Sequence, residues 1–343
     1  MAAHVMFAVA GSGKTTTLIE RLNLEQRALI VTYTENNYAH LLRSVIRKFG
    51  YVPPNITLMT YFGFLNGFCY RPQLELRLGT RGLSFRAPPD YTRNIARGRI
   101  AYYKDDKGYL FHNRLAKLLQ VTDKIPRIIA RIERFYDQFF IDEVQDFAGH
   151  DFDLLIGLMP ARVDILLVGD FYQHTFDTSR DGPTNRTLHH DINRYERRFS
   201  DAGVHVDKET LSNSWRCGPT VCGFISSYLQ ININSHRRDE TSIIPVTTQE
   251  HANAIHSDSE IIKLFYQESY KYQCEALNWG ASKGMDHFQD VCVVLSEQNW
   301  RLYLGGNFAA MSASTRNKLY VACSRARGNL YLAREQHFRC FKA

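Results

Sequence analysis

A glycine-rich turn near the N-terminus constrains the fold of this chain more than any other feature. Residues 4–9 (HVMFAV) have the pattern of a short buried strand, Gly11-Ser12-Gly13 form a turn, and Lys14 begins a helix with an apolar face. Exposed backbone N–H groups at such a turn and the positive end of the helix together favour an anion. The strand, turn and helix therefore predict an α/β domain that binds the phosphates of a nucleotide.

The same turn indicates which residues contact the nucleotide. Lys14 is placed to reach the β- and γ-phosphates, and the hydroxyl of Thr15 is placed to bind Mg²⁺. The strict P-loop pattern has a glycine six residues before the lysine, where this chain has Ala8. A glycine-rich turn without a ligand is the alternative, and the matching strand and helix on its two sides argue against it. The predicted nucleotide-binding residues here are Ala10, Gly11, Ser12, Gly13, Lys14, Thr15 and Thr16.

An acidic cluster follows a second buried strand. In residues 138–146 (QFFIDEVQD), Asp142 and Glu143 come directly after an apolar run. Beside a phosphate-binding turn, Asp142 is predicted to bind Mg²⁺ and Glu143 to act as the general base on the attacking water. A purely structural acidic turn is the alternative. A later strand ends in a segment that places Gln173 to sense the γ-phosphate, so the predicted cofactors are ATP and Mg²⁺.

Composition narrows the classes of protein that the chain can belong to. With 343 residues, of which 44% are hydrophobic and 22% charged, the chain is globular and long enough for two domains. No apolar run approaches the ~20 residues that cross a bilayer, and no signal-peptide pattern is present, so we expect a cytoplasmic protein without a membrane partner. The seven cysteines contain no CxxC pair and are expected to be reduced thiols.

The positive charge of the chain is concentrated in one segment. Residues 71–134 contain 15 Lys or Arg against 6 Asp or Glu, whereas the net charge of the whole chain is +7. Basic and aromatic residues that alternate in this way suit a nucleic acid, whose backbone is anionic and whose bases stack on rings. A solvated charged face, or a helical insertion that docks on a protein partner, are the alternatives. The aromatic residues are Phe85, Tyr91, Tyr102, Tyr103, Tyr109 and Phe111.

A series of ordered motifs resembles those of the UvrD/Rep-like superfamily 1 DNA helicases. They are AVAGSGKT (8–15), VTYTENN (31–37), ITLMTYFGF (56–64), IDEVQD (141–146), VGDFYQHTF (168–176), LSNSWRCGP (211–219), SKGMDHFQDV (282–291) and KLYVACSRAR (318–327). The resemblance extends along nearly the whole chain. It indicates a compact member of that family, because the segment between Pro219 and Ser282 is too short for the accessory insertion of the second domain.

The resemblance implies an α/β fold of two RecA-like P-loop NTPase domains with parallel sheets. The first domain is expected over residues 1–206, with a short basic insertion over about 66–134. The second is expected over residues 207–343. Within the first, residues 178–203 have the pattern of a loop and an amphipathic helix with Ile192, Tyr195 and Phe199 on its apolar face. Within the second, residues 249–260 are expected to be a loop, followed by a helix.

The resemblance also implies roles for residues of the second half. Arg216 and Arg325 correspond to two arginine fingers that contact the γ-phosphate across the cleft between the domains. Trp215 is expected to stack on the adenine, Gly284 to bring backbone close to a phosphate, and Asp286 to contact the ribose. The family's adenine-reading segment has no counterpart before the P-loop, so selectivity for ATP over GTP would depend on this stacking.

Three further implications concern the nucleic acid and the acidic motif. Gln145 is expected at the interdomain cleft, in contact with the network around the γ-phosphate. Gln173 couples the γ-phosphate to the strand-binding surface. The residues that correspond to single-strand contacts are Thr32, Tyr33, Thr60, Tyr61, Phe64 and Phe176.

Two functions of different classes follow from the resemblance. The first is ATP hydrolysis coupled to 3′→5′ translocation on single-stranded DNA, or on RNA, with duplex unwinding. The second is a DNA- and nucleotide-sensing ATPase that regulates a partner nuclease without unwinding. For this second function, a small UvrD-like chain of this kind resembles the helicase-like subunits of bacterial anti-phage defence systems such as Gabija, which implies an OLD-type nuclease as the partner. A GTPase or kinase is excluded, because neither accounts for Arg216, SKGMD and Arg325 in this order.

Overall fold

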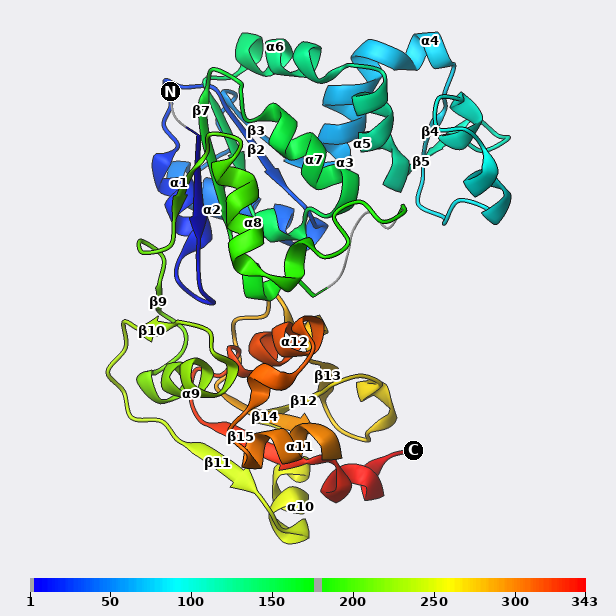
Figure 1. Cartoon of the computed structure of the whole chain (residues 1–343). Helices are drawn as coiled ribbons and strands as arrows, with labels where there is room; N and C mark the ends of the chain where they lie inside the picture. The colour runs from blue at the N-terminus through cyan, green and yellow to red at the C-terminus, as the bar shows by residue number, and fades with distance from the viewer. Residues whose placement is uncertain (1–2, 176–180) are drawn as a thin grey trace. The chain divides into compact units, whose positions relative to one another are not determined.

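Parallel β-strands organise both halves of the chain (Figure 1). The computed structural model describes residues 3–175 and 181–343. Of these, residues 3–6, 15–169 and 181–207 form a first compact unit, and residues 7–14, 170–175 and 208–343 form a second. Residues 7–14 and 170–175 therefore group with the second unit, although the rest of that unit begins at residue 208. The fold class is the predicted mixed α/β class with parallel sheets.

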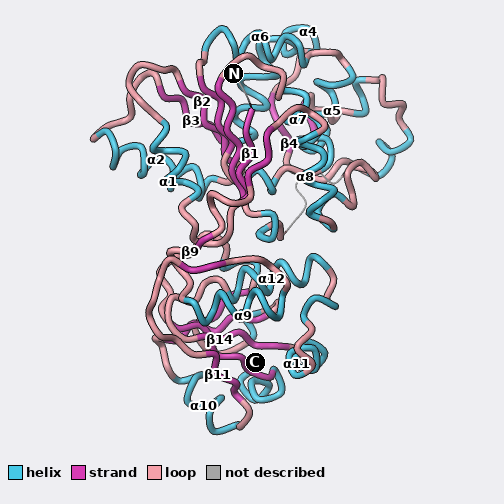
Figure 2. The backbone as a smooth tube through the Cα atoms, turned by 60° about the vertical axis from the view of Figure 1, so that its left-hand side comes forward, coloured by secondary structure: helices cyan, strands magenta, loops and turns pink. Residues whose placement is uncertain are grey.

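The first unit is built on a six-stranded sheet with the strand order β3-β2-β6-β7-β1-β8, whose strands run alongside one another in Figure 2. The pairs β1–β8, β2–β3, β2–β6 and β6–β7 are parallel. Every residue of β2 and β6 is buried, as in parallel sheets that are covered on both faces. The strands are β1 (Ala3–Phe7), β2 (Ala28–Thr32), β3 (Ile56–Thr60), β6 (Gln138–Ile141), β7 (Asp164–Gly169) and β8 (His205–Asp207).

Helices that follow the strands complete the first unit. The best-capped is α2, which starts after Thr34, whose side chain accepts from Asn37 N, and ends at Gly50 in the left-handed region. In α8 the predicted apolar face is confirmed, since Tyr195 and Phe199 are fully buried against Phe152. The helices are α1 (Lys14–Arg21), α2 (Glu35–Phe49), α3 (Tyr61–Gly63), the π-helical η1 (Phe64–Glu75), α4 (Leu76–Leu78), α5 (His112–Val121), α6 (Ile125–Phe135), α7 (Gly149–Leu158) and α8 (Ile192–Ser200).

The basic segment forms a small substructure around two short parallel strands, β4 (Gly82–Ser84) and β5 (Tyr109–Phe111). Some of its charge is internal. Arg114 is only 2% exposed, and its guanidinium carbon lies 3.9 Å from the centre of the Tyr102 ring. The Nε of Arg114 also lies 3.1 Å from Oδ1 of Asp181. Lys117 is also buried, at 4% exposure, so two of the basic residues of the segment lie in its interior.

The second unit contains a five-stranded parallel sheet with the order β11-β15-β14-β12-β13. A second, two-stranded parallel sheet joins β9 (Asn213–Ser214) to β10 (Asn234–Ser235). The apolar core of the second unit includes the fully buried Trp279, whose Nε1 donates to the Leu264 carbonyl at 3.0 Å. The remaining elements are β11 (Ile243–Val246), β12 (Ile261–Phe265), β13 (Ala276–Asn278), β14 (Asp290–Leu295), β15 (Leu330–Arg334), α9 (Pro219–Leu229), α10 (Gln249–Ser257), α11 (Glu297–Leu304) and α12 (Ala313–Cys323).

The predicted loop and helix of the second unit were wrong. Residues 249–257 form α10, which is capped by the Thr248 side chain accepting from His251 N. Residues 261–265 form β12, a fully buried strand paired on both sides by β13 and β14. A short apolar run such as residues 261–265 has no periodicity that distinguishes a buried strand from a helix. Its position between β13 and β14 in the sheet shows that it is a strand. No helix among the described residues is long and apolar enough to cross a membrane.

Candidate nucleotide-binding site

The glycine-rich loop between β1 and α1 is held by backbone hydrogen bonds within the second unit. Val9 N donates to the Leu211 carbonyl at 3.0 Å, and Trp215 N donates to the Gly11 carbonyl at 2.8 Å. Gly11 and Gly13 have φ angles of 72° and 92°, in the left-handed region that favours glycine. The turn therefore has the conformation that the sequence predicts. It is attached to the segment that carries Trp215.

Gly11→Ala is expected to destabilise the protein by about 2–4 kcal/mol, combining left-handed strain with overpacking. A Cβ atom at Gly11 would lie 2.6 Å from Cβ of Arg216 and 2.9 Å from Oγ of Ser214. Gly203 is the matched control, because its φ is +75° but a Cβ there meets no atom within 4 Å. Urea unfolding should show the larger loss for Gly11→Ala. Equal losses in the two variants would mean that the contact with Arg216 is not tight.

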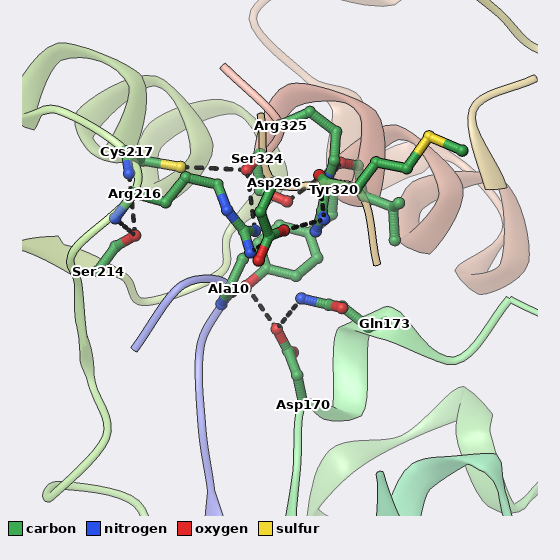
Figure 3. A network of polar contacts seen from close by, with 12 residues as sticks. Ala10, Asp170, Gln173, Ser214, Arg216, Cys217, Asp286, Tyr320, Ser324 and Arg325 are labelled. Carbon is green, nitrogen blue, oxygen red and sulfur yellow. Dashed lines mark hydrogen bonds and ion pairs between the residues drawn. The ribbon is translucent and has the colours of Figure 1, made fainter. Parts of the chain in front are cut away.

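A chain of hydrogen bonds connects this loop to the segment after β7 (Figure 3). Ala10 N donates to the Tyr320 hydroxyl at 2.8 Å, and that hydroxyl donates to Oδ2 of Asp170 at 2.9 Å. Gln173 Nε2 donates to the same oxygen at 2.9 Å. Burial and then Asp170 raise the pKa of Tyr320 well above its ordinary value, so its hydroxyl keeps the proton that it donates. Asp170 thus holds the amide of Gln173 beside the glycine-rich loop.

Sequence reasoning missed Asp170 and Tyr320 as site residues. Both carry a signal in retrospect. Asp170 directly follows the buried strand β7, the position at which Asp142 was identified after β6. Tyr320 lies inside the motif KLYVACSRAR, which was used only for its arginine. Both side chains are 0% exposed, and a hydrogen bond in the protein interior is electrostatically stronger than one in water.

Arg216 and Arg325 share a single carboxylate (Figure 3). Oδ1 of Asp286 lies 2.5 Å from Nη2 of Arg216 and 3.2 Å from Nη1 of Arg325. Arg325 is only 1% exposed, and its Nη2 has no hydrogen-bond partner among the described residues. Burial, with Arg216 as a second cause, lowers the pKa of Arg325 to about 10, so it remains a cation at neutral pH. The resemblance assigned Asp286 to a ribose, but here its partners are the two arginines.

The charge balance of this cluster favours an anion. Burial alone would raise the pKa of Asp286, but Arg216 and Arg325 outweigh it, and Lys14 also contributes, so the pKa is lowered. Two buried guanidinium groups therefore share one carboxylate, which by itself balances only one of their two positive charges. Phosphate oxygens would satisfy the unpaired donor of Arg325. Gly284 lies two residues before Asp286 with φ of +83°, and a Cβ there would meet no atom within 4 Å.

Trp215 presents an exposed ring next to the glycine-rich loop. The two-stranded sheet pairs Ser214 with Ser235, so the residues that follow, Trp215 and His236, lie beside each other. Their rings stack at 3.9 Å with an interplanar angle of 16°. Trp215 is nevertheless 64% exposed, which leaves ring surface on which a base can stack. His236 was not identified from the sequence, because its pairing with Trp215 depends on strand register.

The acidic motif lies in the first unit, at the end of β6. Asp142 is 3% exposed, and its N–H donates to the Val31 carbonyl at 2.9 Å. Glu143 has φ 55° and ψ 50°, a left-handed conformation that costs a non-glycine residue on the order of 1–2 kcal/mol. Gln145 is fully buried, and its Nε2 donates to Oε2 of Glu143. The amide therefore orients the predicted general base, whereas the resemblance had placed it toward the γ-phosphate network.

The donors assigned to Mg²⁺ have suitable chemistry. Thr15 lies in the first turn of α1 and is partly exposed, and Asp142 ends β6. A hydroxyl and a carboxylate are oxygen ligands of the kind that Mg²⁺ prefers. No group of three or more His, Cys, Asp or Glu in the described part of the chain could hold a metal ion. When bound by one or two protein oxygens, Mg²⁺ commonly completes its coordination with water and substrate phosphates. Thr16 is exposed, and Ser12 is 6% exposed with no hydrogen-bond partner for its Oγ among the described residues.

Several of the predicted single-strand contacts are buried. Thr32, Tyr61 and Phe64 are 1%, 2% and 2% exposed, so their side chains offer no surface to a base. Tyr33 and Thr60 are partly exposed. Phe176 lies outside the described residues.

Comparisons with known proteins agree with this fold. No protein-family model matches the sequence, and no curated protein matches it. A structure of the arterivirus nonstructural protein 10 helicase with DNA has a TM-score of 0.50 and 16% identity over 96% of this chain and 60% of that chain. A second structure of the arterivirus helicase has a TM-score of 0.50 and 15% identity over 98% and 62%.

This likeness concerns the fold. The chain shares the fold of these arterivirus helicase structures, and it spans about 60% of the length of the helicase chains that it resembles. At 15–16% identity the likeness shows the fold alone, and it does not show the UvrD/Rep-like family.

Proposed function

We propose that this protein hydrolyses ATP and couples the hydrolysis to movement along single-stranded DNA in the 3′→5′ direction, with unwinding of a duplex. The carrying observation is that Arg216 and Arg325 share the carboxylate of Asp286, whose pKa Lys14 of the glycine-rich loop also helps to lower. Such a cluster suits a triphosphate, and the order of the motifs matches the UvrD/Rep-like branch. The fold that the chain shares with a structure of the arterivirus nonstructural protein 10 helicase with DNA supports the same proposal.

Each residue has a distinct part in the proposed hydrolysis. Lys14 and the N–H groups of the loop bind the phosphates, and Glu143 accepts the proton of the attacking water. Arg216 and Arg325 exchange Asp286 for oxygens of the γ-phosphate and stabilise the charge that develops there. Gln173, held by Asp170, senses whether that phosphate is present. When bound at Thr15 and Asp142, Mg²⁺ would neutralise phosphate charge.

Trp215→Ala is expected to weaken ATP binding about 5- to 150-fold, because base stacking contributes ~1–3 kcal/mol. The loss should be similar for GTP, since an indole stacks on any purine. Equilibrium titration with ATP, GTP and tripolyphosphate would measure it. Tripolyphosphate, which has no base, should bind the variant and the parent protein equally, and Trp215→Phe should retain most of the affinity. A loss that is as large for tripolyphosphate would contradict the stacking role.

ATPase assays with and without single-stranded DNA, together with strand displacement, test the proposed function. We expect stimulation by single strands, displacement of a duplex with a 3′ tail but not a 5′ tail, and no hydrolysis by Lys14→Ala. Parallel assays with RNA decide the nucleic acid. Stimulation without displacement would support the alternative, an ATPase that senses DNA and regulates a partner nuclease. Full hydrolysis by Lys14→Ala would overturn the assignment of the site.

A further inference from the structure

A row of aromatic rings begins at the carboxyl end of the main sheet in the first unit. The register of β2 and β3 pairs Thr32 with Thr60, so the next residues, Tyr33 and Tyr61, lie side by side. Their rings stack with centroids 5.4 Å apart and an interplanar angle of 22°. Phe62 meets the edge of Tyr33 at 5.7 Å. The rings at this edge of the sheet therefore continue outward through Phe62.

The basic segment supplies the rest of the row by the same geometry. The register of β4 and β5 pairs Ser84 with Phe111, so Phe85 and His112 are neighbours. Their rings stack at 5.1 Å with an interplanar angle of 28°. Phe62 contacts both, at 5.2 Å from Phe85 and 5.5 Å from His112. We call Tyr61, Tyr33, Phe62, Phe85 and His112 the aromatic row.

The row runs from the core to the surface. Tyr61 is 2% exposed, whereas Phe85 is 63% exposed. Phe85 is nonetheless held in place, because His112 covers one side of it and is itself anchored by Nδ1 at 3.1 Å from the Ser84 carbonyl. Burial of Phe85 therefore does not explain its position. A large ring that is both exposed and fixed loses little entropy when a flat partner stacks on it.

The charge around Phe85 indicates the partner. Residues 77–107 contain eight Lys or Arg and three Asp or Glu. Arg86 is the next residue in the chain and Arg81 is four residues before Phe85, and both are exposed. A flat apolar ring among exposed cations matches a single-stranded nucleic acid, which offers unpaired bases and a phosphate backbone. The exposed basic residues of this range are Arg77, Arg81, Arg86, Arg93, Arg97, Arg99 and Lys107.

We propose that Phe85 is a base-stacking platform for single-stranded DNA, with Arg81 and Arg86 contacting the phosphates on either side. Phe62 and His112 position the ring. The proposal rests on the proposed function, because it takes the DNA strand as the partner. Phe85 lies outside the helicase-like motifs, so the proposal adds a DNA contact that those motifs do not include. Phe85 is exposed to solvent, whereas Tyr61 and Phe64, which the motifs indicate as strand contacts, are buried.

Binding of fluorescein-labelled oligonucleotides to the full chain tests the proposal. Phe85→Ala should weaken binding of oligo-dT about 5- to 150-fold, the effect of one lost stacking platform. Binding of an abasic oligonucleotide of equal length should not change, and Phe85→Trp should restore the affinity for oligo-dT. Tyr91→Ala is the matched control, because Tyr91 is 56% exposed in the same basic segment and does not belong to the row. It should bind oligo-dT like the parent.

The outcomes separate this proposal from the proposed function. If the parent chain binds oligo-dT and its ATPase is stimulated, an unchanged affinity in Phe85→Ala overturns only the role of Phe85. An equal loss on the abasic strand, or in Tyr91→Ala, overturns it as well, because stacking would not be the cause. If the parent chain does not bind single strands at all, the proposed function fails first. A loss that appears only with oligo-U would overturn the assignment to DNA.

Discussion

Arg325→Ala is expected to lower kcat for ATP hydrolysis by about 10³–10⁵-fold, the effect of losing an arginine finger. Among the residues that the structure describes, Nη2 of this buried guanidinium has no partner, while Nε and Nη1 donate to the Val321 and Met285 carbonyls and fix its position. The dissociation constant for ATP should change much less than kcat, because the contact strengthens in the transition state. Single-turnover hydrolysis with a parallel binding titration would measure both quantities.

Two further variants make this result specific. Arg325→Lys keeps the charge but not the planar fork, and should recover only a small part of the rate. Arg327→Ala removes an exposed arginine two residues away, and should leave the rate within about twofold, the scale of a surface change. A rate in Arg325→Ala within tenfold of the parent, with the protein folded by circular dichroism, would contradict the finger assignment.

Glu143→Gln is expected to lower kcat by about 10²–10⁴-fold while ATP still binds, because the amide cannot accept the proton of the attacking water. The side chains are nearly identical in shape, so the left-handed backbone at this position is retained. Glu20→Gln, on the exposed face of α1, is the control for loss of a carboxylate. Hydrolysis by Glu143→Gln at the parent rate would exclude the residue as the base.

The variant Gln145→Leu tests the role of Glu143 as the base indirectly. Its amide donates to Glu143, so its removal should lower kcat less than Glu143→Gln does. Single-turnover hydrolysis with a parallel ATP titration would measure this effect. Hydrolysis by Gln145→Leu at the parent rate would contradict the role of Gln145 in orienting the base.

Local patterns were sufficient for the parts of the site that depend on adjacent residues. The turn at Gly11, Ser12 and Gly13 and the strand before Asp142 were predictable, because strand, turn and helix succeed one another within a few residues. The buried face of α8 was predictable for the same reason. Patterns of neighbouring residues also distinguish apolar strands from surface loops, but they did not distinguish the strand β12 from a helix.

Contacts between distant residues could not be predicted from such patterns. Asp286 meets Arg216, 70 residues earlier, and Tyr320 meets Asp170, 150 residues earlier. Neither pair has a sequence spacing that implies contact, since only folding brings them together. The aromatic row depends in the same way on strand register. The resemblance supplied Arg216 and Arg325, but the identity of their common acceptor required the structure.

The shared carboxylate of Asp286 has a consequence for the release of products. When a phosphate dissociates from Arg216 and Arg325, the two guanidinium groups are not left without an anion, because the carboxylate of Asp286 lies within ion-pair distance of both. A tethered competitor has an effective concentration that dilution cannot reduce. Asp286 therefore lowers the affinity of the two arginines for any other anion, and it also lowers the free energy needed for that anion to dissociate. In the proposed ATP hydrolysis, Asp286 would thus favour the release of phosphate from the two arginines after each turnover.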